Sequence, residues 1–127
     1  MTYDDFLEAF PDAKAPDEMG KGATAMMMRP GVSCVVFHDP DGLDVTGARL
    51  MVRVGGNRSR YVQFAATLHE VFQELTCCDH GVATRLLRET GILDFQGTFS
   101  PTILDDEWKV SPLLTGDIFS VDVMRAH

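Results

Sequence analysis

The chain has few of the sequence features of a secreted, membrane-spanning or nucleic-acid-binding protein. It has three cysteines in 127 residues. Cys77 and Cys78 are neighbours that cannot easily pair with each other, so we expect reduced thiols. No apolar run approaches the ~20 residues of a membrane helix. Only 11 residues are basic against 19 acidic, and this net charge of −8 argues against direct binding of a nucleic-acid backbone.

The N-terminal stretch "MTYDDFLEAF" is acidic and has the character of neither a signal peptide nor a transit peptide. We therefore expect a protein that is made and kept in a cytosol-like compartment, or assembled there into something larger. The length of 127 residues suits one domain, covering 1–127. A chain of this size can bury roughly two thirds of its unfolded surface, so it needs no metal or disulfide to fold.

Familiar enzyme motifs are also missing. The glycine pair Gly55 and Gly56 has neither the spacing of a phosphate-binding loop nor that of a dinucleotide fingerprint, and no nucleophile elbow occurs. Two glycines allow a tight turn, and Asn57 or Ser59 can cap a helix. We interpret the segment as the corner where a strand becomes a helix, although its amide ends could attract an anion.

The hydrophobic period changes across this corner. Before Gly55 the apolar residues alternate, which predicts a strand over 45–54, and after Asn57 they recur at helical spacing, which predicts a helix from about Arg58 to Leu75. The stretch "VSCVVFH" (Val32–His38) is apolar on both faces, which is typical of a central strand. "DPDG" after it predicts a turn, so these two strands should form an antiparallel hairpin.

The remaining segments complete an α+β domain. We predict an antiparallel sheet of about four strands packed on one long amphipathic helix, with one or two short helices. Residues 11–25 are predicted to be an irregular connector, and residues 101–117 a long loop between the last strands. The other predicted elements are short helices over 4–10 and 79–91 and strands over 92–98 and 117–126.

Polar clusters offer weak candidates for chemistry. Asp39, Asp41 and Asp44 resemble part of a calcium loop but lack its distant glutamate and flanking helices, so a hairpin turn is the better interpretation. Adjacent cysteines cannot easily point at one metal. A thiol nucleophile with a histidine base stays conceivable, because such pairs need only meet in space. The residues concerned are Cys34, His38, His69, Cys77, Cys78 and His80. We predict no catalytic residue, cofactor or metal.

The segment "LDDEW" (Leu104, Asp105, Asp106, Glu107, Trp108) is the other candidate. Its three carboxylates in a row suit a solvated loop better than an acid–base pair across a cleft. A tryptophan in a long loop either folds onto the core or meets another chain. We predict an interface here and at Asp39–Asp44, and expect Trp108→Ala to spare the fold while weakening association.

The order of elements resembles a family, the small phage tail terminator proteins, also described as minor capsid or head–tail joining proteins. The resemblance is one of element pattern and spacing over about three quarters of the chain, and it contains no diagnostic motif. Residues 12–28 and the helix near 79–91 fit it less well. The segments that carry it are "DDFLEAF", "RLMVRVGG", "SRYVQFAATLHEVFQEL", "TFSPTILDDEW" and "GDIFSVDVM".

The resemblance implies a non-enzymatic virion component of the tail or neck, assembled in the bacterial host cytoplasm. Members form a hexameric ring that caps the tail tube and joins it to the head connector. Such a ring repeats one heterologous contact until it closes, and exposed sheet edges can provide the pairing. Negative charge facing the bore would let DNA pass without specific binding.

Two other classes remain open. The chain could be a small acidic interaction protein, such as a phage-encoded inhibitor or immunity protein that blocks a basic partner. It could also be a small enzyme that uses the cysteine and histidine set, which would show as turnover lost on cysteine substitution. Ring formation, a stable monomer that co-purifies with a basic partner, or measurable turnover would distinguish the three.

Overall fold

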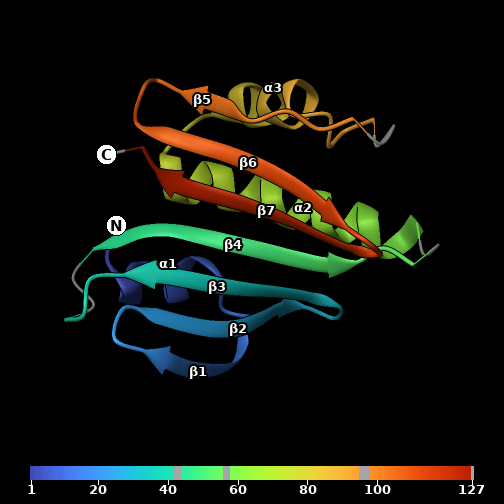
Figure 1. The fold of residues 1–127 in the computed structure, drawn as a ribbon. Helices are drawn as coiled ribbons and strands as arrows, with labels where there is room; N and C mark the ends of the chain where they lie inside the picture. The colour runs from blue at the N-terminus through green and yellow to red at the C-terminus, as the bar shows by residue number, and fades with distance from the viewer. Residues whose placement is uncertain (42–43, 56–57, 95–97, 127) are drawn as a thin grey trace.

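A computed structural model describes residues 1–41, 44–55, 58–94 and 98–126 (Figure 1). Within these ranges the chain forms three helices on one seven-stranded sheet. In chain order the elements are α1 (Tyr3–Ala9), β1 (Lys14–Gly20), β2 (Ala23–Arg29), β3 (Val32–His38), β4 (Val45–Arg53), α2 (Arg58–Thr76), α3 (His80–Glu89), β5 (Thr102–Leu104), β6 (Trp108–Thr115) and β7 (Ile118–Arg125).

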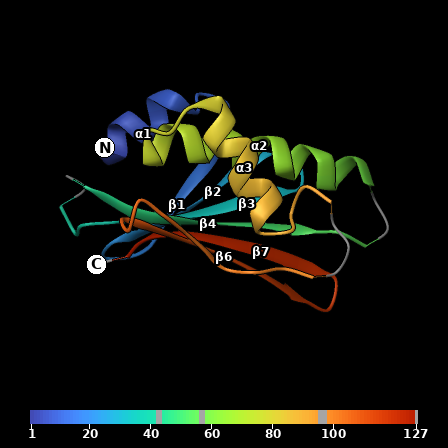
Figure 2. The same cartoon turned by 90° about the horizontal axis from the view of Figure 1, so that it is seen from above.

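The sheet is antiparallel throughout, with the strand order β1-β2-β3-β4-β7-β6-β5. The helices lie on one of its faces (Figure 2). The prediction of about four strands on one long helix is therefore wrong, because the fold is a mostly-sheet α+β arrangement of seven strands and three helices. The predicted hairpin of β3 and β4 and the long helix over Arg58–Thr76 are confirmed.

The strands missed by sequence reasoning lie in the two segments that had been interpreted as irregular. Strand β1 occupies part of 11–25, and each of its residues whose burial is described is exposed, so it carries no hydrophobic alternation. Pro16 falls at a shift of its register against β2. Residues 101–117 contain β5, which has three residues, and the whole of β6. The strand predicted over 92–98 is absent at Ile92–Asp94, which form a turn, and residues 95–97 lie outside the described ranges.

Strand β6 pairs with β7 along its whole length, but with β5 only at Trp108–Val110. The two-residue turn at Gly116 and Asp117 makes Thr115 and Ile118 a hydrogen-bonded pair, so alternate residues, Pro112 among them, direct their backbone groups outward. A proline at such a position removes one outward N–H donor from the edge of the sheet.

The core lies between the sheet and the helices. Helix α2 directs one apolar stripe at the sheet, as its 3.6-residue period predicts. Helix α1 adds Phe6, and α3 adds Leu86 and Leu87. Helix α1 begins with a capping box in which the Thr2 hydroxyl accepts from the Asp5 N–H and the Asp5 carboxylate accepts from the Thr2 N–H. The fully buried aromatic residues are Phe6, Phe64, Phe72 and Phe119.

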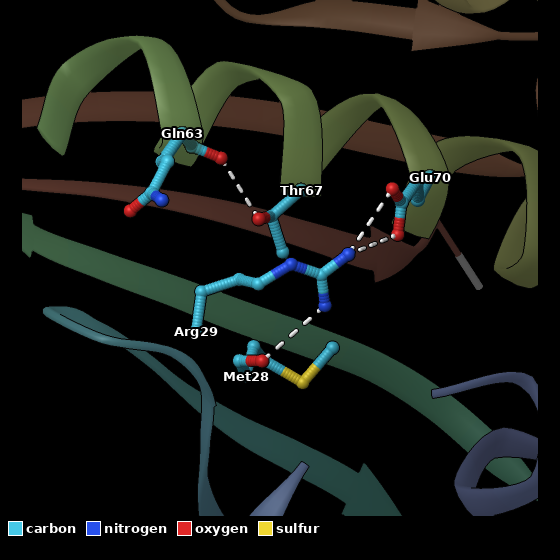
Figure 3. A network of polar contacts seen from close by, with 5 residues as sticks. All are labelled: Met28, Arg29, Gln63, Thr67 and Glu70. Atoms are coloured by element: carbon cyan, nitrogen blue, oxygen red, sulfur yellow. Dashed lines mark hydrogen bonds and ion pairs between the residues drawn. The ribbon is translucent and has the colours of Figure 1, made fainter. Parts of the chain in front are cut away.

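Helix α2 is also tied to β2 by polar contacts (Figure 3). The Arg29 guanidinium reaches both carboxylate oxygens of Glu70, at 3.2 Å and 3.0 Å, and also donates to the Met28 carbonyl at 3.4 Å. The buried Thr67 hydroxyl donates to the Gln63 carbonyl at 2.8 Å within the helix. These contacts satisfy the polar groups along the line where α2 crosses β2.

Candidate functional site

The sheet face opposite the helices is the surface that the fold leaves uncovered among the described residues (Figure 2). We call it the open face. It consists of the alternate side chains of the five central strands that do not enter the core. These are Ala23, Ala25, Met27, Ser33, Val35, Phe37, Gly47, Arg49, Met51, Arg53, Lys109, Ser111, Leu113, Thr115, Ile118, Ser120, Asp122 and Met124.

The open face is unusually apolar for a surface in contact with water. An antiparallel sheet with one wet face normally alternates apolar and polar residues. Here Leu113 is 61% exposed, and Met27 and Ile118 are each 43% exposed. Val35 and Phe37 of β3, partly buried, lie opposite Ala25 and Ala23 of β2, on the same side of the sheet as Met27. Contact with the helices therefore explains the apolar residues on one face of β3, but not those on its other face.

One ion pair crosses the middle of the open face. Arg49 of β4 and Asp122 of β7 are cross-strand neighbours, and the guanidinium Nε and Nη2 donate to Oδ1 and Oδ2 at 2.7 Å and 3.0 Å. The hydrogen bonds that Arg49 donates to Asp122, and the negative charge of that carboxylate, raise the pKa of Arg49. The Arg49 guanidinium also lies 5.9 Å from the centroid of the Phe37 ring. Arg49 thus has its charge partner within the same molecule.

A depression of about 520 Å³ lies beside this ion pair, over β4, β7 and β6. Met51 and Ser120, next to the ion pair in the sheet, line this depression. Leu113 and Ile118 line it with apolar side chains. No cluster of reactive groups converges on it among the described residues. Its lining suits a side chain from another protein surface better than a chemical reaction.

A glycine shapes the neighbouring part of the open face. Gly47 stands between Phe37 and Met124 in the register of β3, β4 and β7. A Cβ at this position would collide with the Met124 sulfur and would come within 2.8 Å of the Val123 carbonyl oxygen. The missing side chain therefore gives Met124 the space to lie flat across β4.

Six of the eight residues that sequence reasoning assigned to an interface gather at one end of the sheet, where β4 begins and β5 ends. We call this group the acidic end. The β3–β4 and β5–β6 connections bring it together, at the left of Figure 1. Residues 42 and 43 of the first connection lie outside the described ranges. The acidic end consists of Asp39, Asp41, Asp44, Asp105, Asp106 and Glu107.

Arg125 connects the two halves of the acidic end. Its Nη1 lies 3.5 Å from the Asp44 carboxylate, and its guanidinium lies 5.1 Å from the Trp108 ring centroid. Asp105 and Asp106 have φ angles of 51° and 58°, and the Glu107 N–H donates to the Leu104 carbonyl at 3.0 Å, so this segment is a tight turn. Five of these six acidic residues are exposed to solvent, and Asp44 is partly buried.

The two remaining residues of that prediction are buried. Leu104 and Trp108 are each 5% exposed and belong to the hydrophobic core. The prediction that Trp108 stands in a loop and reaches another chain is therefore wrong about its position, because Trp108 begins β6 and packs beneath the helices. Its alternation with Val110 was a strand signal that Pro112, two residues later, obscured.

The strand-to-helix corner carries arginines rather than a phosphate-binding loop. Gly55 has a φ of 25°, and Gly56 and Asn57 lie outside the described residues. Arg58 and Arg60 stand in the first turn of α2, which holds no acidic residue. Gly55 and the start of α2 at Arg58 fit the predicted corner between a strand and a helix.

The cysteine and histidine residues do not assemble into a reactive site. Burial of Cys34 raises the pKa of its thiol to about 12. Cys78 donates weakly to the Phe72 carbonyl at 3.5 Å. The rings of His69 and His80 lie 4.6 Å apart, and His69 Nε2 lies 3.1 Å from the Thr84 hydroxyl oxygen. Among the described residues no group of three or more His, Cys, Asp or Glu side chains could hold a metal ion.

Comparison with known proteins adds no relative. The chain matches no family model, no curated protein and no solved structure. None of the helices in the described part of the chain is long and apolar enough to cross a membrane. The open face is therefore the feature on which a functional argument has to rest.

Sequence reasoning missed the open face as a site. The signal was present in β3, whose residues are apolar at both odd and even positions, and in the leucine and isoleucine residues that flank the β6–β7 turn. The pattern of β3 predicts a central strand, which is confirmed, whereas Leu113 and Leu114 fall in the predicted loop over 101–117 and Ile118 falls in the last predicted strand. A sheet with only one covered face leaves half of these apolar residues in water.

Proposed function

We propose that this protein is a structural, non-enzymatic subunit that docks onto neighbouring proteins through its open face. The single observation that supports this is the broad apolar sheet face with no helix over it. Monomeric proteins seldom expose contiguous apolar patches of more than a few hundred Å², and larger ones usually mark an interaction site. Covering Leu113, Ile118 and Met27 would remove an unfavourable contact with water.

The more specific form of the proposal follows the family resemblance. The subunit acts as a phage tail terminator that caps the tail tube and joins it to the head connector, as a ring of six copies in the virion tail or neck, assembled in the host cytoplasm. Such a ring needs a rigid scaffold, which the seven-stranded sheet supplies. The acidic end, placed toward the bore, would repel DNA phosphates and let the genome pass.

The test begins with the genes beside the coding sequence. The proposal expects tail-tube and tape-measure genes there, and it expects the neighbouring tail-tube protein to form capped tubes of limited length when co-expressed with this chain. Negative-stain images would show a ring of density at one tube end. Absence of structural phage genes, or tubes of unchanged length that carry no cap, would contradict the terminator reading.

A second candidate is supported by the acidic end. A protein that blocks a basic partner needs carboxylates clustered on one exposed surface, and six acidic residues lie at this end of the sheet, of which Asp44 is 3.5 Å from Arg125. This inhibitor reading expects one basic protein bound in a fixed ratio, with binding that weakens as salt rises. A variant with Asp39, Asp105 and Asp106 changed to asparagine should lose that partner, whereas substitutions on the open face should not.

A further inference from the structure

We infer that in the free protein the open face is covered by the open face of a second copy of this chain, forming a face-to-face dimer. This inference rests on the proposed function in one respect, because it uses the same docking surface. It goes further by naming the occupant. In an assembled tail the second copy would be exchanged for the neighbouring component.

The size of the open face fits this occupant. Strands ~4.8 Å apart that rise ~3.3 Å per residue give the five central strands a face of roughly 600 Å². Stable interfaces bury about 1,200–2,000 Å² in total over both partners. Two copies packed face to face would therefore reach the lower end of this range, whereas a single strand or helix would cover only part of the face.

The charge distribution also favours a second copy at this place. The five central strands present Arg49, Arg53, Lys109 and one acid, Asp122, on the open face, within a chain whose net charge is −8. The edge strand β1 adds Lys14 and Asp17, which cancel. Arg49 is paired with Asp122 and Arg53 lies 3.5 Å from the Asp117 carboxylate, so most of the positive charge of this face is compensated within each copy. The excess negative charge lies elsewhere, and two copies can meet here with little repulsion.

The central ion pair can enter such an interface without leaving a charge unpaired. Asp122 already accepts two hydrogen bonds from Arg49. Burying a charge that has lost its partner is costly, whereas a paired and hydrogen-bonded charge is tolerated. Two sheets pack about 10 Å apart with their side chains interdigitated. The depression between Met51, Leu113 and Ile118 offers space for an apolar side chain from the facing copy.

The experiment compares two glutamate variants of the full chain by sedimentation equilibrium, from low micromolar to near millimolar concentration. Leu113→Glu places a charge on the open face, and Val62→Glu is the matched control, because Val62 is 58% exposed on α2 and Leu113 is 61% exposed on β6. The unchanged protein should approach twice the chain mass of 14.0 kDa. Leu113→Glu should weaken the dimer at least ten-fold, and Val62→Glu should leave it intact.

Circular dichroism and thermal unfolding of each variant, at a concentration where all are monomers, would verify that Leu113→Glu folds. If it fails to fold, Ser120→Glu on the same face replaces it. A protein that stays monomeric at every concentration would overturn the inference, and so would a dimer that Val62→Glu weakens and Leu113→Glu does not. A monomer that nevertheless caps tail tubes would leave the proposed function standing while the inference fails.

Discussion

Arg125 lies against the Trp108 ring, with its guanidinium carbon 5.1 Å from the ring centroid. This contact closes the end of the sheet, because Arg125 also reaches Asp44 while the Ala126 N–H donates to the Glu107 carbonyl at 2.6 Å. The ring itself is almost entirely buried. Trp108 is therefore a structural residue of this end, and its removal tests the fold.

We expect Trp108→Ala to lower the free energy of unfolding by about 3 kcal/mol or more, the range for truncating a buried aromatic residue. Chemical denaturation followed by circular dichroism measures this change. Ile103→Ala is the control, because Ile103 is 58% exposed on the neighbouring β5 and should change stability by less than about 0.5 kcal/mol. Equal effects of the two substitutions would contradict the burial of the tryptophan.

The buried thiol of Cys34 predicts a pattern of chemical reactivity. Burial raises its pKa from the ordinary 9.0 to about 12, so the native thiol stays protonated and shielded, whereas Cys77 is exposed. A disulfide reagent should modify Cys77 rapidly and Cys34 only at the rate of unfolding. Rapid reaction of Cys34 in the native protein would show that β3 is not covered by the helices.

The raised pKa of Cys34 also predicts a loss of stability at high pH. In the folded state the Cys34 thiol keeps its proton up to about pH 12, whereas in the unfolded state it releases the proton above about pH 9. Between these two pH values the unfolded state therefore binds fewer protons than the folded state. The free energy of unfolding should therefore fall as pH rises above about 9. Cys34→Ala would remove this contribution, and a denaturation series across pH in both proteins measures it.

The two glycines Gly47 and Gly81 predict opposite responses to alanine. A Cβ at position 47 would collide with Met124 and with the Val123 carbonyl, so Gly47→Ala should cost about 1–3 kcal/mol. At position 81, in the first turn of α3, the nearest atom is Asp79 Oδ1 at 3.5 Å, which is ordinary contact. Gly81→Ala should therefore stabilise the protein by up to about 1 kcal/mol. Thermal unfolding of both variants gives the two signs.

The capping box of α1 predicts a coupling between Thr2 and Asp5. Hydrogen bonds from Thr2, first its backbone N–H and then its side chain, lower the pKa of Asp5. A lowered folded pKa gives stability that is present above the ordinary value of 3.8 and is lost as pH falls. Thr2→Ala removes the side-chain hydroxyl but keeps the backbone N–H, so the Asp5 pKa should move only part of the way up toward its ordinary value, as followed by nuclear magnetic resonance titration. An unmoved pKa would mean that the Thr2 side chain does not contribute to the box in solution.

Sequence reasoning succeeded where a hydrophobic period was long and uninterrupted. The α2 stripe and the β3–β4 hairpin have strong local signals, since their burial alternates with the periods of helix and strand. It failed at β1, β5 and β6. Edge strands bury few side chains, a three-residue strand shows no period, and Pro112 interrupts the alternation that begins at Trp108.

The site was harder to predict than the fold. The acidic residues were visible in the sequence, but their meeting at one end of the sheet depends on the strand order, in which β7 inserts between β4 and β6. The open face depends on which face of the sheet the helices cover. The sequence shows that a residue is apolar but not whether it lies on the covered or the uncovered face. Met27 and Leu113 become a surface only once the register of β2, β3, β4, β7 and β6 is known.

Pro112 has a consequence for how copies of this protein can accumulate. Fibrous aggregates grow when a bare strand offers a full row of amide donors and carbonyl acceptors to the next chain. The outer side of β6 is interrupted by Pro112, and the opposite border of the sheet, β1, is interrupted by Pro16 and its irregular register. Continued edge-to-edge pairing of strands is therefore disfavoured. At high concentration the protein should form discrete oligomers of fixed stoichiometry and not amyloid-like fibrils.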